Sequence, residues 1–143
     1  MATTASAATT ARPQPGLNRW VPRLAIAAAA LHFAVAFTVA DWRGIVGNGF
    51  VNTVGDAAVP DNDVRMSTLW FFMAGMGFLA FGTFARWAVK MTGRMPAQIG
   101  GYLLAAGVPM TIIQPVSGGV LLTAIGVLAL RAARHDPAAR PGA

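Results

Sequence analysis

The stretch AQIGGYLLAAGVPMTIIQPVSGGVLLTAIGVLAL, residues 97–130, contains no charged side chain. As one α-helix its 34 residues would be about 51 Å long, far more than the ~30 Å hydrocarbon core of a bilayer. Gln114, Pro115 and the Gly118–Gly119 pair interrupt it, and proline and glycine are the strongest breakers of a helix. We therefore expect two short membrane-spanning helices, at about 97–113 and 116–131, joined by a tight turn.

Two further apolar runs precede this stretch, at about 21–40 and 67–89. Each is long enough to cross a bilayer as a helix, at about 1.5 Å per residue. The sequence thus predicts an all-α, transmembrane four-helix bundle with up-down-up-down topology. Its parts are a disordered tail at 1–18, a four-span domain at 19–134 with an outer loop at 41–66, and a second tail at 135–143.

The composition supports a membrane protein. Of 143 residues, 55% are hydrophobic and only 11% are charged, and the mean hydropathy is +0.55. Soluble domains are about one quarter charged, and disordered chains are still more polar. The net charge of +6 would suit a nucleic-acid binder, but the basic residues lie at the ends of apolar runs and form no stripe. We therefore expect the lipid bilayer, and no nucleic acid, as the partner.

Basic residues are distributed unequally between the two sides of the predicted bundle. Residues 1–23, 86–94 and 131–143 hold nine of the eleven Lys and Arg residues, whereas the outer loop holds two of them and four of the five Asp. Cytoplasmic loops of membrane proteins carry the excess of Lys and Arg. The sequence predicts a multi-pass protein of the cell (cytoplasmic) membrane with both termini in the cytoplasm.

Tryptophan residues bracket the first two predicted spans. The pairs are Trp20 with Trp42, and Trp70 with Trp87. Their separations correspond to about 33 and 26 Å of helix, close to the distance between the two interfaces of a bilayer. We expect all four to lie at the membrane interface.

His32 is a titratable side chain near the middle of the first predicted span. Such residues are costly in hydrocarbon and indicate either a functional site or a hydrogen bond to a neighbouring helix. The functional alternatives are a proton relay, an axial haem ligand, or a polar contact to a buried ligand. The structural alternative is a neutral His32 bonded to a threonine, to Gln114 or to a backbone carbonyl. The candidate ligand-binding residues are His32, Met73, Met76, Met110 and Gln114.

The sequence predicts no catalytic residue, no metal site and no cofactor. Cysteine is absent, which excludes disulfides and thiolate ligands. A haem-dependent redox protein is the least supported class, because the second histidine, His135, lies in the predicted tail. The spans lack the buried carboxylate that a proton-coupled carrier of cations needs.

Small residues recur at helical spacing in the spans, which is typical of membrane helices that pack closely. The candidate packing residues are Ala28, Ala36, Gly75, Ala97, Gly101, Ala105, Gly118 and Gly119.

Several short motifs together carry a resemblance to a known family. They are Arg19–Trp20 before the span with His32, the loop residues Trp42, Gly44 and Ile45, the Phe- and Gly-rich second span ending at Arg86, and the final hairpin with Pro96, Ile99–Gly100 and Pro115–Gly119. Over about residues 17–134 the chain resembles a family of small bacterial, actinobacterial-type four-span membrane proteins, classed as a domain of unknown function, number 6463. The resemblance implies four spans but no activity and no catalytic residue.

Two functions remain open on the sequence. The first is a non-enzymatic membrane component that self-associates or packs with a membrane protein partner. The second is a carrier or binding protein for a small hydrophobic, quinone-like molecule, with His32 as its polar anchor. A pocket between the helices, lined by His32 and the aromatic residues of the second span, would favour the second function.

Overall fold

A computed structural model of the chain describes residues 16–47, 49–50, 58 and 60–134. Within them the protein is all-helical, and the order of its helices is α1 (Leu17–Val39), α2 (Trp42–Gly47), α3 (Asn62–Thr92), α4 (Ala97–Ile113) and α5 (Gly119–Arg134). Two of these, α1 and α3, are long and apolar enough to cross a membrane, and α4 is a shorter apolar helix.

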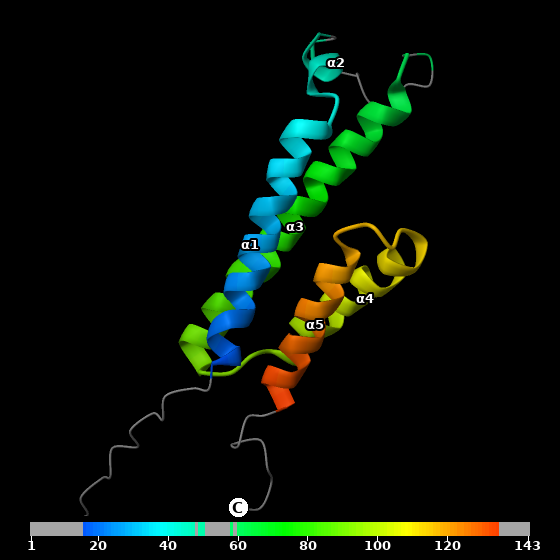
Figure 1. Cartoon of the computed structure of the whole chain (residues 1–143). Helices are drawn as coiled ribbons and strands as arrows, with labels where there is room; N and C mark the ends of the chain where they lie inside the picture. The colour runs from blue at the N-terminus through cyan, green and yellow to red at the C-terminus, as the bar shows by residue number, and fades with distance from the viewer. Residues whose placement is uncertain (1–15, 48, 51–57, 59, 135–143) are drawn as a thin grey trace, which may run out of the picture.

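The four long helices run alternately in opposite directions, and the short α2 lies at the far end of α1 (Figure 1). The start of α1, the end of α3 and the end of α5 therefore meet at one end of the molecule, here called the basic end. The described cations at the basic end are Arg19, Arg23, Arg86, Lys90, Arg94, Arg131 and Arg134. The described acids, Asp41, Asp61 and Asp63, all lie at the opposite end, so the charge asymmetry of the sequence becomes an asymmetry of the fold.

The two helical hairpins differ in length. At about 1.5 Å per residue, the 23 residues of α1 and the 31 of α3 span about 35 and 46 Å. The 17 residues of α4 and the 16 of α5 span only about 25 Å. The turn between α4 and α5 consequently lies part of the way along α1 and α3, which continue beyond it (Figure 1).

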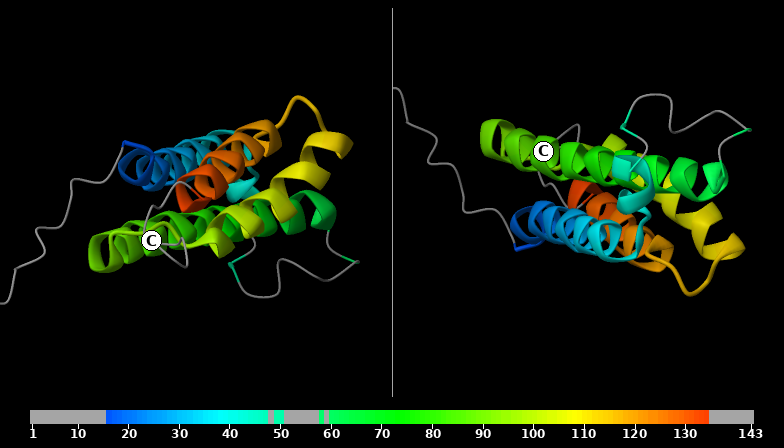
Figure 2. Two further views of the ribbon diagram at one scale, coloured as in Figure 1. Left: turned by 90° about the horizontal axis from the view of Figure 1, so that it is seen from below. Right: turned by 90° about the horizontal axis from the view of Figure 1, so that it is seen from above.

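The hydrophobic core lies in the half of the molecule nearer the basic end, and all four long helices contribute to it. Figure 2 shows the arrangement of these helices from below and from above. Helix α1 contributes Val21, Ala25 and Ala28, and α3 contributes Ala85. The remaining core residues are Met95, Ile99, Leu103, Leu122, Ile125, Ala129 and Ala132. Small residues on α1 and larger ones on α4 and α5 let the helices interdigitate, as in any close-packed interior.

Glycines allow the backbones of paired helices to approach closely. A Cβ on Gly107 of α4 would lie 2.7 Å from the backbone nitrogen of Thr123 on α5. A Cβ on Gly82 of α3 would lie 3.0 Å from the backbone nitrogen of Ile26 on α1. Because backbone atoms cannot move aside as a flexible side chain can, these glycines set the separation of the helices in each hairpin.

At the end of the molecule opposite the basic end, Asp41 contacts residues of α2 and α3. Its carboxylate Oδ1 accepts a hydrogen bond of 3.0 Å from the N–H of Gly44, and its own N–H donates to Thr68 Oγ1 at 3.1 Å. The buried Arg65 lies with Nε 3.7 Å from Asp41 Oδ2. These contacts join the end of α1, the short α2 and the beginning of α3.

Three helices begin at residues other than those of the predicted spans, and their ends also differ by one to three residues. Helix α1 begins at Leu17, two residues inside the predicted tail at 1–18, and the buried Asn18 side chain donates a hydrogen bond of 3.3 Å to the Gly93 carbonyl. Helix α3 begins at Asn62, inside the predicted outer loop 41–66, which also contains α2. Helix α5 begins at Gly119 instead of 116, and the Gly119 N–H donates to Ser117 Oγ at 3.2 Å. Residues 1–15 and 135–143 of the predicted tails lie outside the described residues.

The predicted packing residues divide into two groups. Ala28, Ala36, Gly75 and Gly119 are buried between helices. Ala97, Gly101, Ala105 and Gly118 are exposed, and Gly101 and Gly118 have no atom within 4 Å of a built Cβ. Within this single chain the second group therefore makes no contact between helices, and packing of these residues stays a prediction. The α4 face that meets α5 carries Gly100, Leu103 and Gly107 instead, because the helix is rotated away from the face that the spacing suggests.

A pair of α4 variants tests the glycine contact. We expect Gly107→Ala to lower the free energy of unfolding by about 1–3 kcal/mol, because the added methyl meets the α5 backbone. Gly101→Ala, on the open face of the same helix, is expected to leave stability unchanged or to raise it by up to about 1 kcal/mol. Thermal unfolding in detergent measures both, and equal effects of the two variants would contradict the helix pairing.

Candidate functional site

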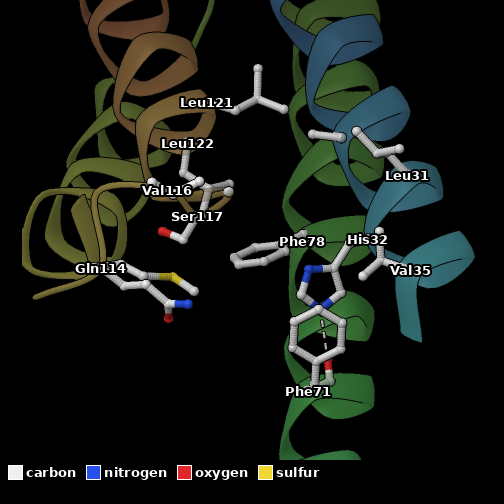
Figure 3. A pocket seen from close by; sticks show the side chains of 13 residues that line it. Leu31, His32, Val35, Phe71, Phe78, Gln114, Val116, Ser117, Leu121 and Leu122 are labelled. Atoms are coloured by element: carbon white, nitrogen blue, oxygen red, sulfur yellow. Dashed lines mark hydrogen bonds between the residues drawn. The ribbon is translucent and has the colours of Figure 1, made fainter. Parts of the chain in front are cut away.

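A cavity of about 360 Å³ lies where the short hairpin of α4 and α5 ends against the sides of α1 and α3 (Figure 3). Three of its walls come from α1, from α3, and from the turn that joins α4 to α5. Its volume falls within the usual range for sites that bind small molecules. Ala28 and Leu122 belong both to the hydrophobic core and to the cavity lining. The cavity therefore lies where the packed core ends.

His32 lies in the wall of this cavity and is half-buried. Its Nε2 is 2.7 Å from the backbone carbonyl oxygen of Phe71 on α3. A carbonyl oxygen can only accept, so Nε2 carries the hydrogen and donates it. This is the bond to a backbone carbonyl that the sequence predicts as the structural alternative, and it joins α1 to α3.

Aromatic rings fix the orientation of the His32 imidazole. The Phe71 ring stacks on it at 3.9 Å between centroids and 23° between planes, and the Phe78 ring meets it edge-on at 5.3 Å. The second ring nitrogen, Nδ1, has no hydrogen-bond partner among the described residues. In the neutral imidazole that nitrogen is a hydrogen-bond acceptor.

Gly75 makes room for the imidazole. A Cβ at this position would lie 2.9 Å from His32 Cδ2 and 2.9 Å from Phe33 Cε1. Real Cβ atoms do not approach other atoms so closely, so any larger residue would push the two rings away from α3. The absence of a side chain at Gly75 therefore determines where His32 lies.

The wall opposite His32 is formed by the α4–α5 turn and carries the other polar groups. Gln114 and Ser117 lie on that side of the cavity, across from the imidazole (Figure 3). Met110, from the last turn of α4, also lines it. The remaining lining side chains are apolar or aromatic. The site is thus a mainly apolar pocket with a few polar groups on facing walls, an arrangement typical of sites for small hydrophobic ligands.

The structure brings together three of the five candidate ligand-binding residues, His32, Met110 and Gln114. Met73 and Met76 do not line the cavity; they are 52% and 48% exposed on α3. The sequence analysis described a pocket lined by His32 and aromatic residues of the second span, but it did not single out Phe71 and Phe78, which form the α3 wall. Their spacing of seven residues places them on one helix face, but the many aromatic residues of α3 hid that signal.

The four tryptophans have different surroundings. Trp20, Trp70 and Trp87 are exposed. Trp42 is half-buried, donates from Nε1 to the Ala36 carbonyl at 2.8 Å, and stacks on Phe37 at 5.7 Å. None of the four lines the cavity.

Comparison with known proteins places the chain in a family. The model of a family of unknown function (DUF6463) matches residues 16–136, most of the chain, and the protein belongs to this family. Searches of curated proteins and of solved structures gave no match.

Nitrogen NMR of the imidazole tests the hydrogen bond at His32. In the neutral ring we expect a protonated Nε2 and an unprotonated Nδ1, because Nε2 donates to Phe71. Gly75→Ala is expected to abolish this uniform tautomer by displacing the ring, whereas Gly77→Ala, which adds a methyl in open space on the same helix, should preserve it. The nitrogen signals of the second histidine, His135, are identified because they disappear when His135 is replaced with asparagine. A protonated Nδ1 in the wild-type protein would refute the geometry.

Proposed function

We propose that this member of the DUF6463 family is a non-enzymatic, four-span protein of the cytoplasmic membrane that binds a small hydrophobic molecule in the cavity beside His32. The observation that carries the proposal is the cavity itself. At the level of His32 the four long helices and the α4–α5 turn border a partly open cavity in place of a filled core. His32 has a structural bond to Phe71, yet it also presents a polar atom to that space.

The membrane placement is supported by what covers the outside of the helices. Large apolar side chains on α1, α3 and α4 are exposed, among them Phe37, Phe84 and Ile112. Monomeric soluble proteins rarely expose such continuous apolar surface. The gathering of cations at the basic end favours a cytoplasmic position for that end and for both termini. Helices α4 and α5, at about 25 Å, are short for a span, which would require the bilayer to thin around them.

The chemistry of the cavity selects a class of ligand. Most of its lining is apolar, so the ligand buries hydrocarbon or an aromatic ring there. The acceptor Nδ1 of neutral His32 suits a hydroxyl donor. On the opposite wall, the Gln114 amide supplies both a donor and an acceptor. A quinol-like molecule, with polar groups at opposite edges of an apolar ring, matches this pattern.

Self-association is a second proposal, supported by a different surface. Ala97, Gly101 and Ala105 lie on one face of α4 that no other part of the described chain covers. Small residues at four-residue spacing are typical of faces on which membrane helices meet. Under this proposal the same protein packs with itself or with a partner through α4.

Native mass spectrometry of the protein in mild detergent, with an absorption spectrum of the same sample, tests both proposals. We expect one bound small molecule per chain, or uptake of one added quinol with a short alkyl tail. Leu121→Trp should weaken the uptake about tenfold or more by filling the cavity, whereas Val127→Trp, on the same helix outside the cavity, should not. His32→Phe keeps an aromatic ring against Phe71 and should cost about fivefold in affinity through one lost hydrogen bond.

The outcomes separate the two functions. Uptake that is equal in the wild type and Leu121→Trp would refute binding in the cavity. A protein without ligand but with a defined number of copies would favour the packing function, and that number should fall to one in Gly101→Leu.

A further inference from the structure

A second cavity, of about 450 Å³, lies at the basic end between the beginning of α1 and the end of α3. Four of its lining residues are cationic: Arg19 and Arg23 from α1, and Arg86 and Lys90 from α3. The cavity does not share a residue with the cavity at His32. The positive charge of this surface is therefore concentrated in a hollow, with each helix contributing two cations.

The four cations have no acidic neighbour in the described chain. The cavity lining contains no carboxylate, and the described aspartates lie at the far end of α1 and α3. Like charges gathered in a concave surface repel one another and attract an anion more strongly than isolated charges do. The arrangement is thus unfavourable for the empty protein and favourable for a bound anion.

Local contacts hold the cavity in shape. The Asn18 side chain donates to the Gly93 carbonyl at 3.3 Å, which ties the first turn of α1 to the end of α3. Arg23 lies over the ring of Trp20, with its guanidinium carbon 5.5 Å from the ring centroid. This contact reduces the freedom of the Arg23 side chain at the cavity.

The positive-inside rule alone does not explain this grouping. Arg131 and Arg134 also lie at the basic end and satisfy that rule, yet they do not line the cavity. Three of the four cavity cations are arginines, whose planar guanidinium groups match two oxygens of one phosphate. The positive-inside rule requires only positive charge on the cytoplasmic side, and it does not require four cations to line one cavity.

From this convergence we propose that the cavity at the basic end binds the phosphate group of an anionic molecule. Its source is a lipid headgroup or a soluble phosphate compound. The exposed Trp20, over whose ring the cavity residue Arg23 lies, favours the lipid, because tryptophan prefers the headgroup level of a membrane. The phosphate site rests on the geometry of α1 and α3 and is independent of ligand binding at His32.

Lipid binding measured by native mass spectrometry tests the site. The full chain in neutral detergent is titrated with phosphatidylglycerol, with phosphatidylcholine and with inorganic phosphate. Arg23→Gln/Arg86→Gln removes one cation from each helix, and the control Arg131→Gln/Arg134→Gln removes the same charge from the same end. At about 1 kcal/mol for each basic residue near a membrane surface, the first pair should weaken binding of phosphatidylglycerol about 30-fold. The control should weaken it less than about threefold if the cavity is the site.

Each outcome bears on the proposal. Binding of phosphatidylglycerol without binding of inorganic phosphate identifies a lipid site, and competition by inorganic phosphate identifies a soluble phosphate compound. Equal losses in the cavity pair and the control pair, or equal binding of phosphatidylglycerol and phosphatidylcholine, would overturn the phosphate site. The four cationic side chains of the cavity are exposed, so the variants should fold, and an unchanged midpoint of thermal unfolding checks this. The variant Arg19→Gln/Lys90→Gln removes the other two cations and repeats the test.

Discussion

The close approach of α1 and α3 is the constraint on which the rest of the molecule depends. At Gly82 the backbones are so close that an added Cβ would lie 3.0 Å from the backbone nitrogen of Ile26. At Gly75 the absence of a side chain leaves space for the rings of His32 and Phe33. The imidazole can therefore reach the Phe71 carbonyl and stack on the Phe71 ring. One contact between two helices thus fixes the position of the only polar side chain that α1 contributes to the cavity.

The unequal lengths of the two hairpins produce the cavity. Glycines along α4 and α5 hold that hairpin together, and its core residues fill the bundle from the basic end as far as Leu122. Beyond this level α4 and α5 end, while α1 and α3 continue (Figure 1). The polar turn at Gln114–Ser117 then faces His32 across an open space, so a polar pocket forms where the packed core stops.

Most of the fold could be predicted from the sequence, because length, charge and helix breakers act locally. The final hairpin was placed correctly by Gln114, Pro115 and the glycines, and the predicted range 97–113 coincides with α4. The rotation of α4 could not be predicted. Its residues are apolar on every side, so periodicity does not distinguish the Gly100–Gly107 face from the Ala97–Gly101–Ala105 face. The sequence singled out His32 because a titratable residue is rare in a predicted span, whereas it did not distinguish Phe71 and Phe78 from the other aromatic residues of α3, which are common there.

The most direct test of the proposed membrane arrangement is the accessibility of single cysteines, since the natural chain has none. Ser117→Cys in the α4–α5 turn, Gly47→Cys at the end of α2, and Arg134→Cys at the basic end are each treated in intact cells with a thiol reagent that cannot cross the membrane. The four-span arrangement predicts that positions 47 and 117 react from outside and that position 134 reacts only after the cells are permeabilised. Reaction of position 134 in intact cells, or protection of position 47, would contradict it.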